Sequence, residues 1–230
     1  MIYYSLKVNL SNFAFGKSSS NHILITMSEE YKGQGHMLHL KLPTDPRWVN
    51  MVEENNIEEI LVDHAYCEQK AATASMSIIV NYPELDEVVD TLMPIVAEEW
   101  EHFERVVKQL RKRGLSLGRM RKDEYVNAIV KFARKGGSRI DQLIDKLLVS
   151  ALIEARSCER FKLLWKGLDD KELKDFYYEL MISEAGHYVT FIDLARKFKS
   201  REEVDTRWQE FLKFEAELLK TLDVRGDRMH

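Results

Sequence analysis

The stretches Glu99-Trp100-Glu101-His102 and Ser183-Glu184-Ala185-Gly186-His187 decide how this chain folds. Each contains a glutamate and a histidine three residues apart, and a helix places such residues on one face. Each of these glutamates has a partner upstream: Glu68 lies 31 residues before Glu99, and Glu154 lies 30 residues before Glu184. Four carboxylates and two imidazoles at this spacing are typical of a helical bundle that binds two adjacent metal ions, usually iron or manganese.

Each half of this pattern contains a helix-breaking signal at its centre. The first half is interrupted by Pro83, which the interior of a helix does not tolerate. The second half is interrupted by Gly167 and Leu168-Asp169, a combination typical of a helix end followed by an aspartate N-cap. Every helical residue adds the same rise, so two antiparallel helices of equal length on either side of the break bring the two glutamates of each half to the same level. We therefore predict two antiparallel helical hairpins.

The alternative is that these acidic residues are ordinary solvated side chains, since 31% of the chain is charged. The neighbouring residues argue against it. Small residues (Ala65, Cys67, Ala71) surround Glu68, and the apolar run 147–153 immediately precedes Glu154. A buried carboxylate is costly unless it is paired or bound to a metal. The spacing thus predicts six metal ligands: Glu68, Glu99, His102, Glu154, Glu184 and His187.

Helical periodicity dominates the chain, and its length of 230 residues with 45% hydrophobic residues allows a substantial core. We predict an all-α fold, a four-helix bundle with extra helices in the crossover and at the C-terminus. The expected helices are 47–81, 84–112, 122–135, 138–166, 170–198 and 201–221. We divide the chain into an N-terminal extension of uncertain structure (1–40), the di-metal bundle (41–200), and a C-terminal helix and tail (201–230).

Several features indicate a cytoplasmic protein without a membrane span. No apolar stretch reaches the roughly 18 residues that a transmembrane helix needs. Cys67 and Cys158 form no Cys-x-x-Cys motif, which argues against zinc or redox chemistry through them. We expect them to be small packing residues beside the metal site, in a reducing compartment. Residues 1–26 lack a signal-peptide pattern. We expect them to be either a miscalled start before Met27 or a peripheral strand and loop.

Positive charge is concentrated in the segment from Arg105 to Arg139, which joins the two hairpins. This segment carries a net charge of +10, although the whole chain carries −4. Its basic surface, expected at one end of the bundle, could contact phosphates, or it could simply be solvated. From charge alone the two interpretations are equally supported. The candidate nucleic-acid contacts are Arg111, Lys112, Arg113, Arg119, Arg121, Lys122, Arg134, Lys135 and Arg139.

Five strings carry a family resemblance: Leu42-Pro-Thr-Asp-Pro-Arg-Trp48, Asp63-His-Ala-Tyr-Cys-Glu-Gln-Lys-Ala-Ala72, Glu98-Glu-Trp-Glu-His-Phe103, Ile153-Glu-Ala-Arg-Ser-Cys-Glu-Arg-Phe161 and Ser183-Glu-Ala-Gly-His-Tyr188. Over roughly Leu42 to Lys199 the chain resembles the MiaE family, tRNA 2-methylthio-isopentenyl-adenosine hydroxylases with a ferritin-like di-iron fold. The family's six ligands fall on the six residues that the spacing selects. Glu159 is a rival for the third carboxylate. We expect Glu159 to pair with Arg156 or Arg160 near the site, and His64 to be either an outer partner of Glu68 or simply packed.

The resemblance implies an oxygen-dependent di-iron monooxygenase that hydroxylates the isopentenyl group of this nucleoside in tRNA. It implies two iron ions (manganese is possible), dioxygen as co-substrate, and an external electron donor such as a reductase. The tRNA anticodon arm is the implied partner, and no catalytic residue beyond the ligands is expected. The alternatives are another ferritin-like di-iron or di-manganese oxidase, or an iron-binding or storage protein. Iron storage requires assembly into a shell, whereas the hydroxylase does not. We therefore expect a monomer or small oligomer.

Overall fold

The computed structural model describes residues 37–55 and 57–230. Every regular element in these ranges is helical, so the predicted all-α fold is confirmed. After a short 3-10 helix (η2, Met37–His39), the helices are α2 (Arg47–Asn55), α3 (Ile57–Asn81), α4 (Asp86–Lys112), α5 (Glu124–Phe132), α6 (Arg139–Gly167), α7 (Lys171–Phe198) and α8 (Arg201–Leu219).

The helix ends are set by local side chains. Asp123, Ser138, Asp170 and Ser200 each accept a hydrogen bond from a backbone N–H in the first turn of α5, α6, α7 and α8. Gly114, just beyond α4, has a φ of 72°, a conformation that glycine adopts without steric cost. These caps explain why the predicted and observed boundaries differ by no more than three residues in most places.

One predicted helix is wrong, because 47–81 is divided into α2 and α3. The two parts bury different surfaces. In α2, Trp48 and Val52 are fully buried, and Val49 packs so closely on the end of α6 that a Cβ on Gly167 would lie 2.5 Å from its side chain. A straight continuation of α3 could not make this contact with α6 while also lying in the bundle.

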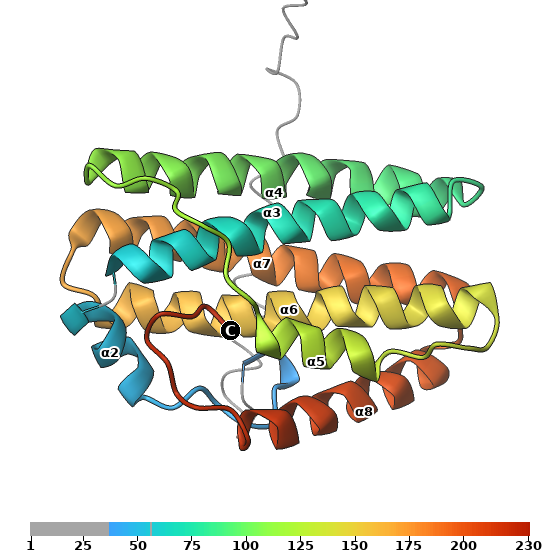
Figure 1. Cartoon of the computed structure of the whole chain (residues 1–230). Helices are drawn as coiled ribbons and strands as arrows, with labels where there is room; N and C mark the ends of the chain where they lie inside the picture. Colours follow the sequence, from blue (N-terminus) through green and yellow to red (C-terminus); the bar gives the residue numbers. More distant parts are fainter. Residues whose placement is uncertain (1–36, 56) are drawn as a thin grey trace, which may run out of the picture.

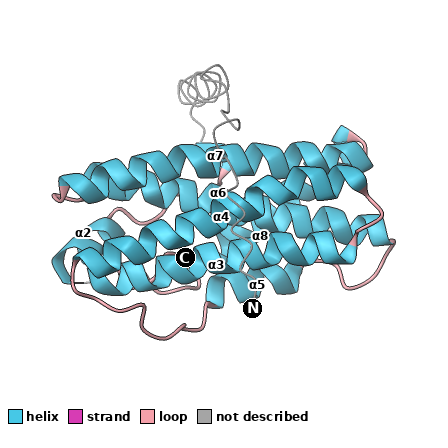
Figure 2. Ribbon diagram, turned by 90° about the horizontal axis from the view of Figure 1, so that it is seen from above, coloured by secondary structure: helices cyan, strands magenta, loops and turns pink. Residues whose placement is uncertain are grey.

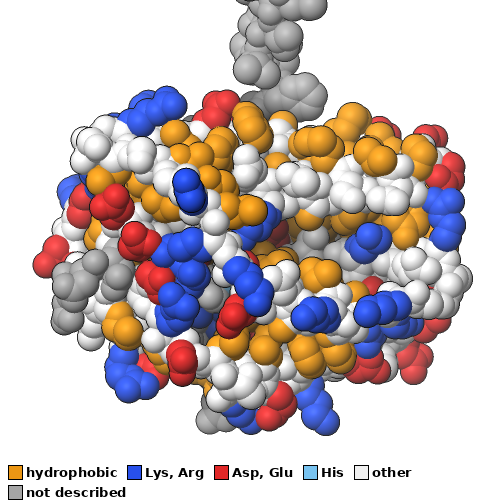
Figure 3. All heavy atoms as spheres, in the orientation of Figure 1, with side chains coloured by type: hydrophobic (Ala, Val, Ile, Leu, Met, Phe, Trp, Pro, Cys, Tyr) orange, Lys and Arg blue, Asp and Glu red, His pale blue; other side chains and the backbone are white. Residues whose placement is uncertain are grey.

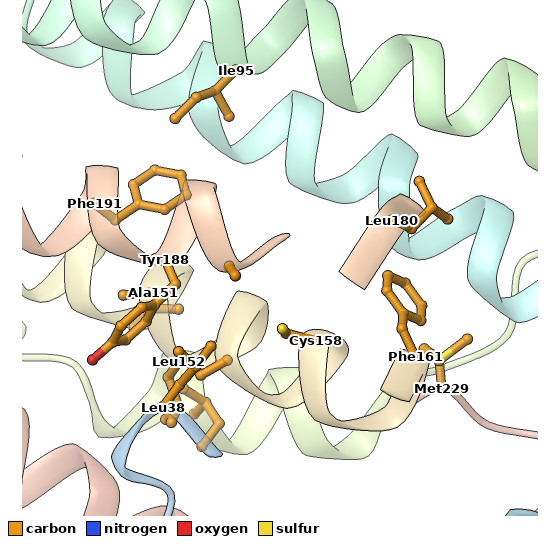
Figure 4. Packing of buried hydrophobic residues seen from close by; sticks show 14 of the residues in the cluster. Leu38, Ile95, Ala151, Leu152, Cys158, Phe161, Leu180, Tyr188, Phe191 and Met229 are labelled. Atoms are coloured by element: carbon orange, nitrogen blue, oxygen red, sulfur yellow. The ribbon is translucent and has the colours of Figure 1, made fainter. Parts of the chain in front are cut away.

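Two antiparallel hairpins, α3–α4 and α6–α7, form the four-helix bundle (Figures 1 and 2). Helices α5 and α8 pack beside α6 and complete the molecule below the bundle in the view of Figure 1. A single buried cluster runs through all of these helices. Figure 4 shows part of it, with Cys158 and Phe161 from α6, Tyr188 and Phe191 from α7, and Met229 from the C-terminal tail.

The C-terminal segment 201–230 contributes to this same core, since Phe211, Leu212 and Met229 are fully buried. Near the other end of the described chain, Leu38 and Leu40 are buried too. The expectations for residues 1–36 lie outside the described residues. Among the described helices, none combines the length and the apolar character that a membrane crossing requires.

The basic crossover does not lie at one end of the bundle, as the sequence suggested. It runs from the end of α4 diagonally over α3 to α5 (Figure 1). Three contacts hold it there. The Tyr66 hydroxyl donates to the carbonyl of Gly118 at 3.0 Å, Lys70 lies 3.3 Å from Asp123, and Arg121 pairs with Glu59. Because α3 supplies a partner along its length, the crossover lies against the side of the bundle.

Candidate metal centre

The six predicted side chains come together inside the bundle, one or two from each of its four helices. All six are buried, with 5% or less of each residue exposed. Their ligating atoms form two groups in which every atom lies within 4.8 Å of the others. The first group contains Glu68, Glu99, His102 and Glu184, and the second contains Glu99, Glu154, Glu184 and His187.

Glu99 and Glu184 belong to both groups, so these two carboxylates could bridge a pair of metal ions. The spacing in the sequence had grouped the residues hairpin by hairpin, but the structure interleaves the hairpins. Nδ1 of His102, on α4, lies 3.2 Å from Oε1 of Glu184, on α7. Nδ1 of His187, on α7, lies 2.8 Å from Oε1 of Glu99, on α4. Each group therefore depends on both hairpins.

The donor set fits a pair of divalent ions. Both oxygens of Glu99, Oε1 of Glu184 and Nδ1 of His102 are buried and lie close to oppositely charged groups, but none of them makes a hydrogen bond of good geometry. Buried polar atoms are nearly always satisfied, so a cluster of atoms that are close together yet poorly hydrogen-bonded is suited to a shared metal ion. The four carboxylates also supply four negative charges, which is the charge that two divalent ions neutralise. Glu and His are ligands that iron and manganese accept.

Without metal, protons stabilise this cluster. Burial opposes ionisation of Glu184, but His102 and His187 keep its pKa well below the usual range. Burial and the charge of Glu184 raise the pKa of Glu99 to about 7. Burial and the same neighbour raise the pKa of Glu154 well above its usual value. Burial alone would lower the pKa of His102, yet its contacts with the carboxylates of Glu184, Glu68 and Glu99 raise it to about 12. Divalent ions would therefore displace protons on binding.

His64 contacts one of the six residues directly. Its Nε2 lies 2.5 Å from Oε1 of Glu68, one turn further along α3. The ring is fully buried, stacked on Tyr177 at 5.5 Å and tilted against Phe161 at 4.8 Å. Burial and Glu184 would raise the pKa of Glu68, but His64 and His102 lower it to about 2. His64 is thus both packed and an outer partner of Glu68, the two roles that the sequence left open.

Glu98 is a partner that the sequence analysis did not identify. Its Oε2 lies 2.8 Å from Nε2 of His187, and its side chain is 41% exposed. A carboxylate that binds the second ring nitrogen of a ligating histidine fixes the orientation and tautomer of that ring. The only sequence signal was its position beside Glu99. Nothing in the helical spacing relates Glu98 to His187, which is 89 residues away on another helix.

Glu159 belongs to neither group of metal-ligating atoms. Its carboxylate accepts hydrogen bonds from Thr44 and from Arg156, at 2.6 Å and 2.5 Å, so the predicted pairing with Arg156 is confirmed. Arg156 is fully buried and also binds Glu215 of α8 at 2.6 Å. This network joins α6, two residues after Glu154, to α8 and to the segment before α2.

Most of the candidate nucleic-acid contacts form ion pairs with acidic side chains, which the sequence did not indicate. Acidic side chains from other elements pair with six of the nine: Lys112 with Glu172, Arg113 with Asp170, Arg121 with Glu59 and Asp227, Lys122 with Glu124, Arg134 with Asp145, and Arg139 with Glu84. Figure 3 shows basic and acidic side chains intermixed on this face. Arg111, Arg119 and Lys135 are exposed and form no ion pair within residues 37–55 and 57–230.

Comparison with known proteins extends the resemblance beyond the region that the sequence strings covered. Residues 34–230 match the family described as tRNA-(MS[2]IO[6]A)-hydroxylase (MiaE). The tRNA 2-(methylsulfanyl)-N(6)-isopentenyladenosine(37) hydroxylase of Pseudomonas putida is 32% identical over 184 residues, covering 80% of this chain and 88% of the relative. The enzyme of the same name from Salmonella typhimurium is 28% identical, covering 83% of this chain and 87% of the relative.

A solved structure shares the fold. It is described as protein 43 with aldehyde deformylating oxygenase activity from Synechococcus. It superposes with a TM-score of 0.78 at 33% sequence identity, covering 83% of this chain and 94% of that chain. The buried Glu and His groups, the bundle and the match over residues 34–230 lead to one conclusion. The chain belongs to the MiaE family of tRNA hydroxylases.

Proposed function

We propose that this protein is an oxygen-dependent di-iron hydroxylase that acts on the isopentenyl group of 2-methylthio-isopentenyl-adenosine in tRNA. The observation that carries the proposal is the pair of buried ligand groups sharing Glu99 and Glu184, in a chain whose named relatives hydroxylate this nucleoside. Two iron ions, held by the six side chains, would supply the oxygen chemistry when bound. The overall reaction inserts one oxygen atom into a C–H bond and reduces the other to water, with two electrons from an external donor.

The protein's own contribution is to hold and orient the ligands in a dry interior. Glu99 and Glu184 would join the two ions, while Glu68 with His102, and Glu154 with His187, would complete one ion each. Glu98 orients His187, and its half-exposed side chain places this end of the centre next to solvent. We infer that the isopentenyl group approaches past Glu98, because this partly exposed side chain contacts His187 directly.

The tRNA is held by its phosphates in this proposal. Arg111, Arg119 and Lys135 are exposed and have no ion-pair partner in the part of the chain that the structure describes, so they would neutralise phosphate without first breaking such a pair. The six ion-paired candidates would contribute less, because each must give up an acidic partner. The overall charge of −4 does not exclude this, since phosphate recognition depends on local charge.

Purified protein, reconstituted anaerobically with ferrous iron, is mixed with a reductant, oxygen and tRNA that carries the prenylated nucleoside. Mass spectrometry of the digested nucleosides should show a gain of one oxygen atom, absent in Glu68→Ala and His187→Ala. No product from protein that retains two irons would refute the tRNA hydroxylase proposal while leaving the di-metal centre intact.

A second candidate function rests on the Synechococcus neighbour, which is 33% identical and is described as having aldehyde deformylating oxygenase activity. The same iron-loaded preparation is therefore also given a long-chain aldehyde, and the hydrocarbon product is measured. Aldehyde turnover without tRNA turnover would favour this function. An assembly the size of a ferritin shell in size-exclusion chromatography would instead favour iron storage, whereas a monomer or small oligomer agrees with an enzyme.

A further inference from the structure

A second cluster of potential metal ligands lies apart from the di-metal centre. Cys67 of α3, Asp123 at the start of α5 and His230 of the C-terminal tail place their ligating atoms within 4.8 Å of one another. Cys67 precedes Glu68, but the two side chains belong to different groups. The tail reaches this position because it folds back over the bundle, where Figure 1 shows the C-terminus beside α3, α5 and α6. The main-chain N–H of Met229 anchors it to Asp63 at 2.8 Å.

The imidazole of His230 is arranged as a ligand. Its Nε2 lies 2.9 Å from the hydroxyl of Ser157, and the ring stacks on Tyr125 at 5.3 Å. With Nε2 occupied by Ser157, Nδ1 faces Cys67, at 3.7 Å from Sγ. A zinc ion with bonds of about 2.3 Å to sulfur and about 2.0 Å to nitrogen, in tetrahedral geometry, separates those two atoms by about 3.5 Å. The observed distance is therefore close to the one that a shared ion requires.

Asp123 has one carboxylate oxygen that is not used in the N-cap of α5. Its Oδ1 accepts the N–H of Val126 as the N-cap of α5, and its Oδ2 lies 3.3 Å from Lys70. Lys70 is the cationic neighbour that a metal ion would have to displace. Its side chain is 31% exposed, so its ammonium group can move into solvent. Asp63 also lies near the cluster, but Arg121 and Arg228, each 3.8 Å from its carboxylate, offset its negative charge.

We propose that Cys67, Asp123 and His230 form a mononuclear site for a divalent ion of the zinc class, with a water molecule as the fourth ligand. Sulfur, imidazole nitrogen and carboxylate oxygen are a donor set that zinc prefers, whereas the all-oxygen and nitrogen set of the di-metal centre suits iron. Binding converts the thiol to a thiolate and releases its proton to solvent. The ion links α3, the crossover and the tail, three segments that are distant in sequence.

The test uses cobalt(II) as a probe added to the full-length protein. Only a thiolate ligand gives an intense sulfur-to-cobalt charge-transfer band in the near ultraviolet, so cobalt in the carboxylate and histidine centre does not contribute. We expect the band in the wild-type protein and in Cys158→Ser, and its loss in Cys67→Ser and His230→Ala. Zinc should abolish the band by displacement. Circular dichroism shows whether each variant is folded.

The outcome that overturns the proposal is a wild-type protein without the band, or a band that survives in Cys67→Ser. A second measurement does not depend on any variant folding. Zinc should slow the reaction of Cys67 with a chromogenic disulfide reagent at least tenfold in the wild-type protein, and an unchanged rate would also overturn the site. Neither readout requires tRNA or catalytic turnover, so both are independent of the proposed hydroxylase activity.

Discussion

Replacing Arg156 with methionine should destabilise the protein strongly, because Arg156 neutralises a carboxylate that has no contact with solvent. Arg156 and Glu215 are both fully buried. The guanidinium donates to Oε1 of Glu215 from Nε at 2.9 Å and from Nη2 at 2.6 Å. It also donates to Glu159 and to the carbonyl of Leu42. Methionine has a similar unbranched stem, so Arg156→Met removes the charge and hydrogen bonds with little change in the volume of the stem.

The expected cost follows from what is left behind. In Arg156→Met the carboxylate of Glu215 keeps one hydrogen bond, from the hydroxyl of Tyr125 at 3.2 Å, and its Oε2 has no partner. Leaving one member of a buried ion pair unpaired costs about 3–5 kcal/mol. In a chain of this size that corresponds to a fall in Tm of about 6–20 °C. Removing both charges in Arg156→Met/Glu215→Leu should restore most of the lost stability, because no unpaired carboxylate remains at position 215.

The assay is urea denaturation of the metal-free proteins, monitored by far-ultraviolet circular dichroism. Arg201→Met is the matched control, since Arg201 lies 3.5 Å from Asp205 in an exposed pair on α8, and such pairs contribute about 0–1 kcal/mol. The reasoning is refuted if Arg156→Met loses no more stability than the control. It is also refuted if Arg156→Met/Glu215→Leu is less stable than Arg156→Met, because the two substitutions would then destabilise the protein independently.

Three further results follow from the geometry. Glu99→Ala should lose both irons, whereas Glu68→Ala should keep about one, because Glu99 belongs to both ligand groups and Glu68 to one. Iron analysis after anaerobic loading and gel filtration checks this, and equal losses would contradict it. Glu98→Ala should weaken iron binding about 10–100-fold without unfolding the protein, because His187 loses the partner that orients it; competition with a chelator measures the change, and an unchanged affinity would exclude the orienting role. Alanine at Arg111, Arg119 and Lys135, which form no ion pair among the described residues, should make the slope of log affinity for tRNA against log salt concentration shallower by about 2–3, because each neutralises about one phosphate. A slope equal to that of the wild-type protein would remove these residues from the interface.

The helices and the six candidate ligands could be predicted from the sequence because their signals are local. The N-caps at Asp123, Ser138 and Asp170 act on the first turn of the helix that follows each of them. The three-residue step from Glu99 to His102 places both side chains on one face of any helix, whatever that helix packs against. The break between α2 and α3 was missed because it depends on how closely α2 approaches α6, a contact that periodicity does not record.

The sequence by itself therefore determined the all-α bundle, the hairpins and which side chains turn inward. Only the tertiary structure decided which carboxylates are shared, since Glu99 and Glu184 meet across two hairpins whose relative position depends on core packing. Tertiary structure also placed Glu98 on His187 and reduced the free charge of the crossover. These contacts join residues 57 to 89 positions apart. A local pattern fixes the direction of a side chain from its own helix, but the partner it meets depends on how the helices pack.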